Sequence, residues 1–577
     1  MSAPLAPIRV KVDSSLAVLL AACGVAAGVL LVVCVLRWRT PPSGVECQYI
    51  TAALHARDNI TGARQLVLAL LHWHFSLGNT SLIGNLVALP FLWALPGRNS
   101  MLWLATITAC ITAVVLLHVL VRRLYRDAQH EEAALAGLAA GLLLLLSPLT
   151  LISAVSFTGT APALMCMIAA LLAYQWARRR NTPAAWCGAS LVLLLSWYAK
   201  PEWGLLFIPA MLLVYCTDEC VYGGWRGGLA ALATFAGGLP CVLLAVHRWQ
   251  ADTASLAVAL GSAGLAGAWL VWLQLGGMRA RRALAFALPA VWAVLLWLIL
   301  FDNASMLLSV ICRQLRVHNG VALAGLYLRH QWCATPVACV VIGALALTGI
   351  PALLPRWPGL LALLAVLAYL AVRVPLAPPI QAVAVYAVVA CFAAAGAVRL
   401  VMTFAHRRIS AWPRLLRAAG AGAALLIIML PGLPRALSND VAPAHLARIP
   451  VFDRHRTGWQ ALALIFATVP PGASVVYTPA TSALSHLTLD AYSRLYGFAW
   501  DVQPWPATLD TAAPHYAVLV TPGAHPLAQR YFGNPELPAY CAAQRASLNA
   551  DARFRLLAET AIADDMLTVS IFHLEEQ

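Results

Sequence analysis

Long apolar runs are the feature that most limits what this chain can fold into. Predominantly apolar stretches of about eighteen residues or more recur along the first three quarters of the sequence, and each can cross a bilayer as a helix. Hydrophobic residues make up 61% of the chain and charged residues only 11%, with a mean hydropathy of +0.78. This composition excludes a water-soluble globule. The sequence therefore predicts an α-helical polytopic membrane protein.

We expect about thirteen membrane spans from length and hydropathy. They fall at residues 16–36, 99–121, 132–155, 158–177, 183–199, 203–216, 227–246, 254–275, 283–301, 333–353, 358–373, 378–402 and 414–432. The first run follows basic residues and lacks a small-residue cleavage site, so it reads as a retained helix and not as a removed signal peptide.

Short arginine clusters between the apolar runs predict the orientation. With a cytoplasmic N-terminus, five clusters lie inside, as the positive-inside rule requires. They contain Arg122, Arg123 and Arg126; Arg178, Arg179 and Arg180; Arg279, Arg281 and Arg282; Arg356; and Arg407, Arg408, Arg414 and Arg417. The main discordance is Arg37 and Arg39, which would lie outside. The formal net charge of +15 is thus a topology signal, and we expect no nucleic-acid partner.

This orientation predicts two domains. Residues 1–432 form the membrane domain, whose first outer loop is 38–98. Residues 433–577 form a small periplasmic α/β domain, of a size that can hold its own core. Its elements are a helical pattern, TGWQALALIFATV, and three strand-like runs, ASVVYTP, HYAVLVT and MLTVSIFHL. The LysProGlu turn at 200–202 and the loop 301–331 also lie outside.

The first outer loop carries one acidic and one basic residue on a single helical stripe. Glu46, Tyr49, Ile50, Ala53 and Arg57 fall at offsets that share one helix face, with the two charges roughly 16 Å apart. A carboxylate just outside an apolar segment is a candidate base for chemistry near lipid. The alternative is a solvated interfacial helix with an ordinary surface glutamate.

The order of these features resembles the GT-C superfamily of integral-membrane glycosyltransferases. The similarity is to the branch of protein O-mannosyltransferases and of aminoarabinose transferases that modify lipid A. That pattern has an acidic motif in the first outer loop, a span that closes on serine-proline, and a basic turn before a later span. The matching segments here are VECQYITAAL, LLLLLSPLTLISAVSFTGTAPALMCMIAALLAY and LLLSWYAKPEWGLLFIPAMLLVY.

The resemblance implies transfer of a sugar from a polyprenyl-phosphate carrier to a lipid, glycan or protein acceptor, with inversion, at the periplasmic face of a bacterial inner membrane. It assigns the family's base to Glu46. The family usually has an Asp-Glu pair there, whereas Val45 precedes Glu46, and Gly159 and Thr160 stand where a second acid often follows the serine-proline span. One carboxylate still suffices to deprotonate an acceptor hydroxyl.

A carrier phosphate needs cations beside it at the outer interface. The sequence offers Arg57, Arg64, Lys200, Arg313, Arg316, His318 and Arg329, with His72 and His74 as further substrate-binding candidates. The alternative is that these side chains contact only anionic lipid head groups, each contributing about 1 kcal/mol.

We expect no certain cofactor. A divalent metal stays open, but the ligand spacing does not support one, because His72 and His74 point about 200° apart on a helix and the cysteines contain no CxxC pair.

Two other functions stay open beside the glycosyltransferase. A transporter or flippase should show matching broken halves and charges at span centres, and the sequence has neither. A non-catalytic scaffold for envelope assembly is favoured by the missing second acid.

Overall fold

The structure is a computed structural model. It describes residues 14–37, 82–94, 100–125, 130–155, 157–233, 277–300, 336–373, 378–408, 451–478, 486–495, 497–504, 515–523, 537–562 and 567–574, with single positions at 49, 50, 53, 54, 62, 65 and 235.

The chain divides into two compact units. The first comprises Met1–Val29, Thr108–Leu151 and Thr160–Pro434, and the second comprises Leu30–Ile107, Ile152–Gly159 and Arg435–Gln577. The second unit thus joins segments that are far apart in sequence. The expected domain boundary at 432/433 lies outside the described residues and stays a prediction.

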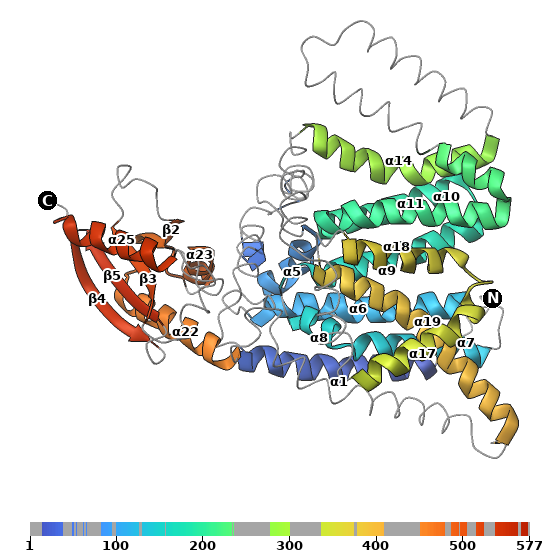
Figure 1. Cartoon of the computed structure of the whole chain (residues 1–577), viewed down its shortest axis with the longest axis horizontal. Helices are drawn as coiled ribbons and strands as arrows, with labels where there is room; N and C mark the ends of the chain where they lie inside the picture. The colour runs from blue at the N-terminus through green and yellow to red at the C-terminus, as the bar shows by residue number, and fades with distance from the viewer. Residues whose placement is uncertain are drawn as a thin grey trace, which may run out of the picture. The chain divides into compact units, whose positions relative to one another are not determined.

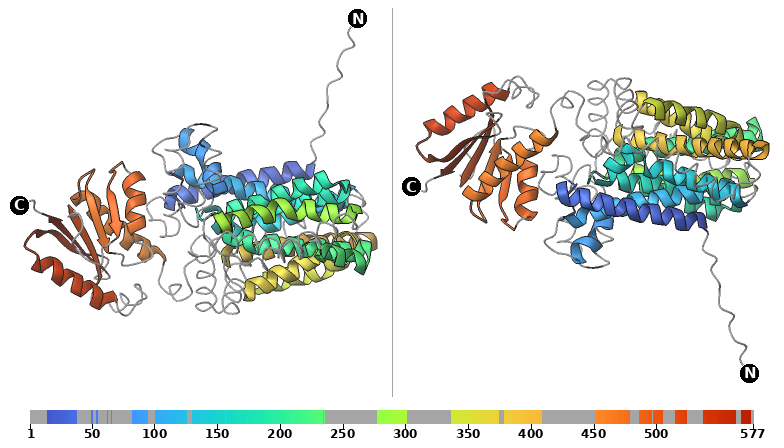
Figure 2. Two further views of the ribbon diagram at one scale, coloured as in Figure 1. Left: turned by 90° about the horizontal axis from the view of Figure 1, so that it is seen from above. Right: turned by 90° about the horizontal axis from the view of Figure 1, so that it is seen from below.

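The first unit is a bundle of apolar helices, seen side by side in Figures 1 and 2. Its contacts pair α17 with α19, α9 with α10, α10 with α14, α11 with α18, and α7 with α19. The helices, some of which extend into the second unit, are α1 (Ser14–Arg37), α6 (Ser100–Leu124), α7 (His130–Leu145), α8 (Pro148–Val155), α9 (Thr160–Arg180), α10 (Pro183–Ala199), α11 (Pro201–Gly223), α14 (Gly277–Leu300), α17 (Pro336–Leu353), α18 (Pro358–Arg373) and α19 (Pro378–Arg408).

The membrane character is confirmed by these helices. Within the described part of the chain, five are long and apolar enough to span a membrane, and the bent pair Glu131–Leu145 and Pro148–Val155 can supply a sixth. Pro183–Ala199, Val337–Leu353 and Pro358–Arg373 are shorter and apolar. Expected spans 254–275 and 414–432 lie outside the described residues, as does most of 227–246. The total of about thirteen spans therefore stays a prediction.

Prolines and small residues fix the helix limits and the closest crossing. Several helices begin at proline, which is suited to the first helical position because its missing N–H needs no partner there. A Cβ at Gly349 of α17 would collide with the Phe392 carbonyl oxygen of α19, and one at Gly396 of α19 would collide with the Leu345 carbonyl oxygen of α17. These two helices therefore touch backbone to backbone, as small residues allow in membranes.

The second unit contains a five-stranded mixed sheet with the order β2-β1-β3-β5-β4. Strand β1 pairs in parallel with β2 and β3, whereas β5 is antiparallel to both β3 and β4. The elements are α22 (Val451–Thr468), β1 (Ser474–Thr478), α23 (His486–Leu495), β2 (Asp501–Pro504), β3 (Tyr516–Pro522), α25 (Leu537–Ala550), β4 (Phe554–Ile562) and β5 (Leu567–Leu574). Helix α5 (Leu82–Ala94) also belongs to this unit.

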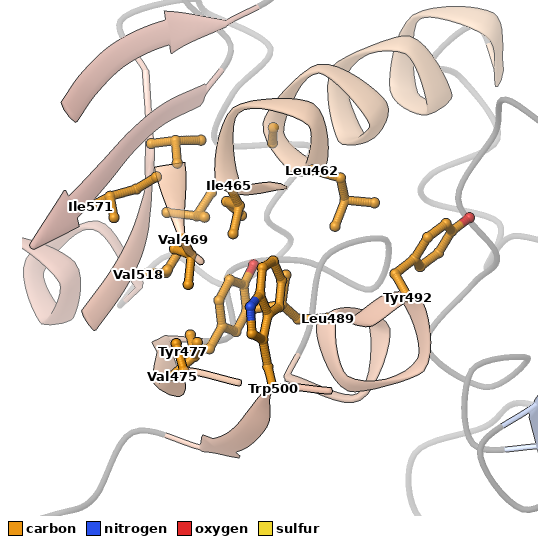
Figure 3. Packing of buried hydrophobic residues seen from close by; sticks show 14 of the residues in the cluster. Leu462, Ile465, Val469, Val475, Tyr477, Leu489, Tyr492, Trp500, Val518 and Ile571 are labelled. Carbon is orange, nitrogen blue, oxygen red and sulfur yellow. The ribbon is translucent and has the colours of Figure 1, made fainter. Parts of the chain in front are cut away.

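Both faces of the central strands are buried. Val518 and Val520 of β3 pack in one cluster with Leu462 of α22 and Leu489 of α23, as Figure 3 shows around Trp500. Alternate β3 residues pack with Leu548 of α25 on the other face. The fold class is confirmed: a polytopic helical membrane protein with a small α/β domain near its C-terminus.

Candidate functional site

The turn at Lys200 contains the one predicted site residue that the structure describes. Helix α10 begins after Thr182, whose hydroxyl accepts a hydrogen bond from the Ala185 N–H (3.3 Å), and ends at Ala199. Helix α11 begins at Pro201, so Lys200 alone connects the two helices. Its extended backbone (φ −161°, ψ 109°) is the conformation favoured before proline.

Backbone hydrogen bonds hold Lys200 on both sides. Its N–H donates to the Ser196 carbonyl oxygen (3.1 Å), and its own carbonyl accepts from the Gly204 N–H (2.9 Å). Lys200 therefore completes the last turn of α10 and the first turn of α11, while its side chain makes no capping hydrogen bond. The Lys200 ammonium is therefore not used to cap α11 and can bind another group.

Close packing beneath the turn fixes its position. A Cβ at Gly204 would lie 2.6 Å from the Trp197 Cα, so the two helices meet there without an intervening side chain. Trp203 stacks on Phe207 with ring centroids 5.3 Å apart, and both rings are buried. The Lys200 backbone is thus held on a rigid base, which suits a residue that positions a ligand.

The turn places an ammonium and a carboxylate next to each other. Lys200 is half-buried, and burial lowers the pKa of its ammonium, an effect that the neighbouring Glu202 carboxylate opposes. The Glu202 Oε2 atom is buried and has no hydrogen-bond partner among the described residues. A second anion near Lys200 would favour its charged form further.

The helical span bends at the serine-proline motif. Helices α7 and α8 meet at 61°, and α6 supports α8 because the Thr106 hydroxyl donates to the Ala154 carbonyl oxygen (2.6 Å). Gly159 follows with φ +70°, in the left-handed region that favours glycine. The place where the family often has a second acid is therefore occupied by a backbone turn.

Part of the first outer loop lies in a buried cluster. Tyr49, Ile50 and Ala53 are helical and buried. They pack in one cluster with the adjacent Leu54 and with residues of other segments: Ala88, Ala105, Phe157 and Ala491. Tyr49, Ile50 and Ala53 are the middle members of the expected stripe. Its charged ends, Glu46 and Arg57, lie outside the described residues.

The other predicted site residues also lie outside the described part of the chain. They are Arg64, His72, His74, Arg313, Arg316, His318 and Arg329. Their roles stay predictions. Across the ranges that the structure describes, no three His, Cys, Asp or Glu side chains gather as metal ligands.

The arginine clusters expected on one side of the membrane do meet at one end of the bundle. Arg179 donates to the Arg123 carbonyl oxygen, and Arg178 donates to the Arg356 carbonyl oxygen (3.2 Å). Arg282 donates to Asn181, at the end of α9. Four clusters that are distant in sequence are therefore neighbours.

Sequence reasoning missed a buried carboxylate at the same end. Asp218 of α11 is 6% exposed. Its Oδ2 accepts from the Tyr174 hydroxyl (2.9 Å) and from the Trp357 indole nitrogen (3.1 Å), and its Oδ1 accepts from the Gly359 N–H (3.0 Å). It joins α9, α11 and α18. The available signal was an acidic residue in the extension of an apolar run, beyond the expected end at 216.

No protein-family model and no curated protein sequence matches the chain. Solved structures do. One is ArnT from Cupriavidus metallidurans, a GT-C glycosyltransferase whose structure was solved with bound undecaprenyl phosphate. It superposes with a TM-score of 0.55 at 12% identity, over 97% of this chain and 98% of that one. The chain adopts the GT-C fold.

Two further solved structures resemble this chain. The apo form of the same ArnT gives a TM-score of 0.50 at 12% identity, over 95% of this chain and 97% of that one. The Archaeoglobus fulgidus oligosaccharyltransferase, solved with zinc and sulfate, gives 0.45 at 14% identity, over 84% of this chain and 62% of that one.

Proposed function

We propose that this GT-C chain transfers a sugar from a polyprenyl-phosphate carrier to a lipid, glycan or protein acceptor of the envelope, with inversion, at the periplasmic face of a bacterial inner membrane. The observation that carries the proposal is the likeness, over 97% of the chain, to an ArnT structure that contains undecaprenyl phosphate. The rigid turn that presents Lys200 supports it.

The proposed reaction is a single displacement. The acceptor hydroxyl oxygen attacks the anomeric carbon of the sugar while the bond from that carbon to the carrier phosphate oxygen breaks, so the configuration inverts. Glu46 takes the hydroxyl proton as general base. The carrier phosphate departs with the bonding electron pair, and nearby cations stabilise its charge.

Lys200 is proposed to bind the carrier phosphate. Its ammonium is half-buried with a lowered pKa, and a phosphate beside it would add to the stabilisation that the Glu202 carboxylate already gives to the charged form. Arg57, Arg64, His72, His74, Arg313, Arg316, His318 and Arg329 are proposed as further substrate contacts.

Lys200→Gln should weaken binding of undecaprenyl phosphate to the purified protein by roughly 10- to 150-fold, the equivalent of a charge-assisted hydrogen bond of about 1.5–3 kcal/mol. Wild-type binding should weaken as pH rises through the lowered pKa of Lys200, before the ordinary lysine value is reached, because only the ammonium form attracts phosphate. A binding titration across alkaline pH measures both effects.

Two control variants sharpen this experiment. Lys200→Arg keeps a charge that does not titrate in this range, so it should bind carrier and lose the alkaline pH dependence. Arg373→Gln removes an exposed cation from the last turn of α18. An equal loss in that variant would mean that Lys200 contributes only general surface charge.

The proposed orientation predicts the location of fused reporters. Alkaline phosphatase should be active when fused after residue 433 and inactive when fused after Arg180, because the arginine-rich end of the bundle favours the cytoplasm. Enzyme activity normalised to fusion abundance is the measurement. A cytoplasmic C-terminus would remove the Lys200 turn from the periplasmic side and contradict the proposed site.

A non-catalytic scaffold is the second candidate function. The observation that favours it is Gly159. This residue stands where the family often has a second acid, and its positive φ places a backbone turn there. The Glu46 experiment described below distinguishes the scaffold from the enzyme.

A further inference from the structure

A hollow of about 430 Å³ opens between α6 and α9 at the arginine-rich end of the bundle. The described residues that line it are Arg123, Gln175, Trp176, Arg179 and Arg180. None of these is acidic. Three guanidinium groups therefore share one concave surface, and the proposed sugar-transfer reaction uses none of them.

One of the three arginines has a structural task, and the other two do not. Arg179 donates to the Arg123 carbonyl oxygen and so joins α9 to α6. The side chains of Arg123 and Arg180 are exposed, and neither makes a hydrogen bond or ion pair with a described residue. Within the described part of the chain their donors are therefore available, and an anion that contacts both would relieve their mutual repulsion.

The hollow also has a buried polar wall. Gln175 is 4% exposed, and its Nε2 atom has no hydrogen-bond partner among the described residues. A buried amide donor without an acceptor carries an energetic cost. A ligand oxygen that accepts a hydrogen bond from this nitrogen would remove that cost. A structural role of the arginines alone does not explain the unpaired amide.

The position of the hollow indicates where such a ligand comes from. Arg123 lies in the last turn of α6 and Arg180 in the last turn of α9, and both helices are candidate spans. The hollow thus lies at the end of two candidate spans, where we expect lipid head groups. Trp176 is 45% exposed, and tryptophan is enriched at that level of membrane proteins.

We propose that this hollow binds the phosphate group of an anionic membrane lipid. Guanidinium groups match phosphate oxygens with paired donors, and basic pockets between helices on the cytoplasmic side bind anionic head groups. Free phosphate offers the same chemistry, so the test must separate the two sources.

The test uses delipidated full-length protein in a non-ionic detergent. Native mass spectrometry counts bound phosphatidylglycerol and bound phosphatidylcholine at matched concentrations. Wild-type protein should prefer phosphatidylglycerol by about tenfold or more, and Arg123→Gln combined with Arg180→Gln should abolish that preference. Gln175→Leu, which changes no charge, should weaken the preference several-fold.

Arg226→Gln is the matched control, because Arg226 is an exposed arginine that lies over the Trp225 ring (5.7 Å) and does not line the hollow. It should leave the lipid preference unchanged. A loss as large as that of the double variant would overturn the proposal in favour of general surface charge.

Millimolar inorganic phosphate is the second arm. If it displaces phosphatidylglycerol and itself protects the wild type, but not the double variant, from thermal unfolding, then a phosphate site is supported with free phosphate as a source. If only the lipid binds in a variant-dependent way, a lipid head group is supported. Equal binding of both lipids by wild type and double variant overturns the proposal.

Discussion

Glu46→Gln should lower glycosyl transfer by roughly 10²–10⁴-fold, the range typical of losing a general base. Glutamine keeps the size and hydrogen-bonding reach of glutamate but cannot take the acceptor proton. Carrier binding should change little, because cations elsewhere are proposed to hold the phosphate. The variant thus separates proton transfer from substrate binding. The measurement is the level of the glycan modification in a deletion strain complemented at matched membrane abundance.

Two further variants define this experiment. Glu46→Asp keeps a carboxylate on a shorter side chain, so it should retain more activity than Glu46→Gln. Glu132→Gln removes a carboxylate from the first turn of α7, where no catalytic role is proposed, and should behave as wild type. Full modification by Glu46→Gln would show that the family's acidic-loop role does not transfer to this chain, and the scaffold would become the better proposal.

Asp218→Ala should lower the free energy of unfolding by about 3–5 kcal/mol. The substitution removes the acceptor of three donors at once, and the Tyr174 hydroxyl, the Trp357 indole and the Gly359 N–H stay in a buried environment. Each unsatisfied buried donor costs about 1–3 kcal/mol, reduced where the structure relaxes. Helix α18 also loses the negative charge at its N-terminus.

Pulse proteolysis in detergent is a suitable measurement of this change. Asp218→Asn keeps one carbonyl oxygen but has no charge and brings an additional donor, so its loss should be smaller than that of Asp218→Ala. Asp551→Ala is the control: Asp551 pairs with Arg553 on the surface (2.7 Å), and such pairs contribute about 0–1 kcal/mol. An equal loss of unfolding free energy in the Asp218 and Asp551 variants would show that the three buried hydrogen bonds of Asp218 stabilise the bundle no more than a surface ion pair does.

The parts of the fold that sequence predicted are those with a strong local pattern. The apolar runs of β1, β3 and β5 were found because central strands are covered on both faces. Strand β4 was missed because it lies at the sheet edge and all but three of its nine residues are exposed. Strand β2 is an edge strand of only four residues. Neither edge strand shows a continuous apolar signal.

The candidate site divides in the same way. The Lys200 turn was predictable, because Pro201 ends one helix and begins the next within three residues. The Asp218 joint was not, since its Trp357 partner is 139 positions away and nothing in either local pattern indicates the pairing. The arginine clusters were predicted to share a side of the membrane, but the hollow among them depends on how α6 and α9 pack.

The single-residue connection at Lys200 also sets the rotational register of α11. Adding or deleting one residue there would turn α11 by about 100° about its axis, which would carry Asp218 away from Tyr174, Trp357 and Gly359 and Gly204 away from Trp197. Insertions and deletions are therefore excluded at this joint while the bundle is kept. The length of this connection therefore determines, at one position, whether both of these contacts of α11 can form.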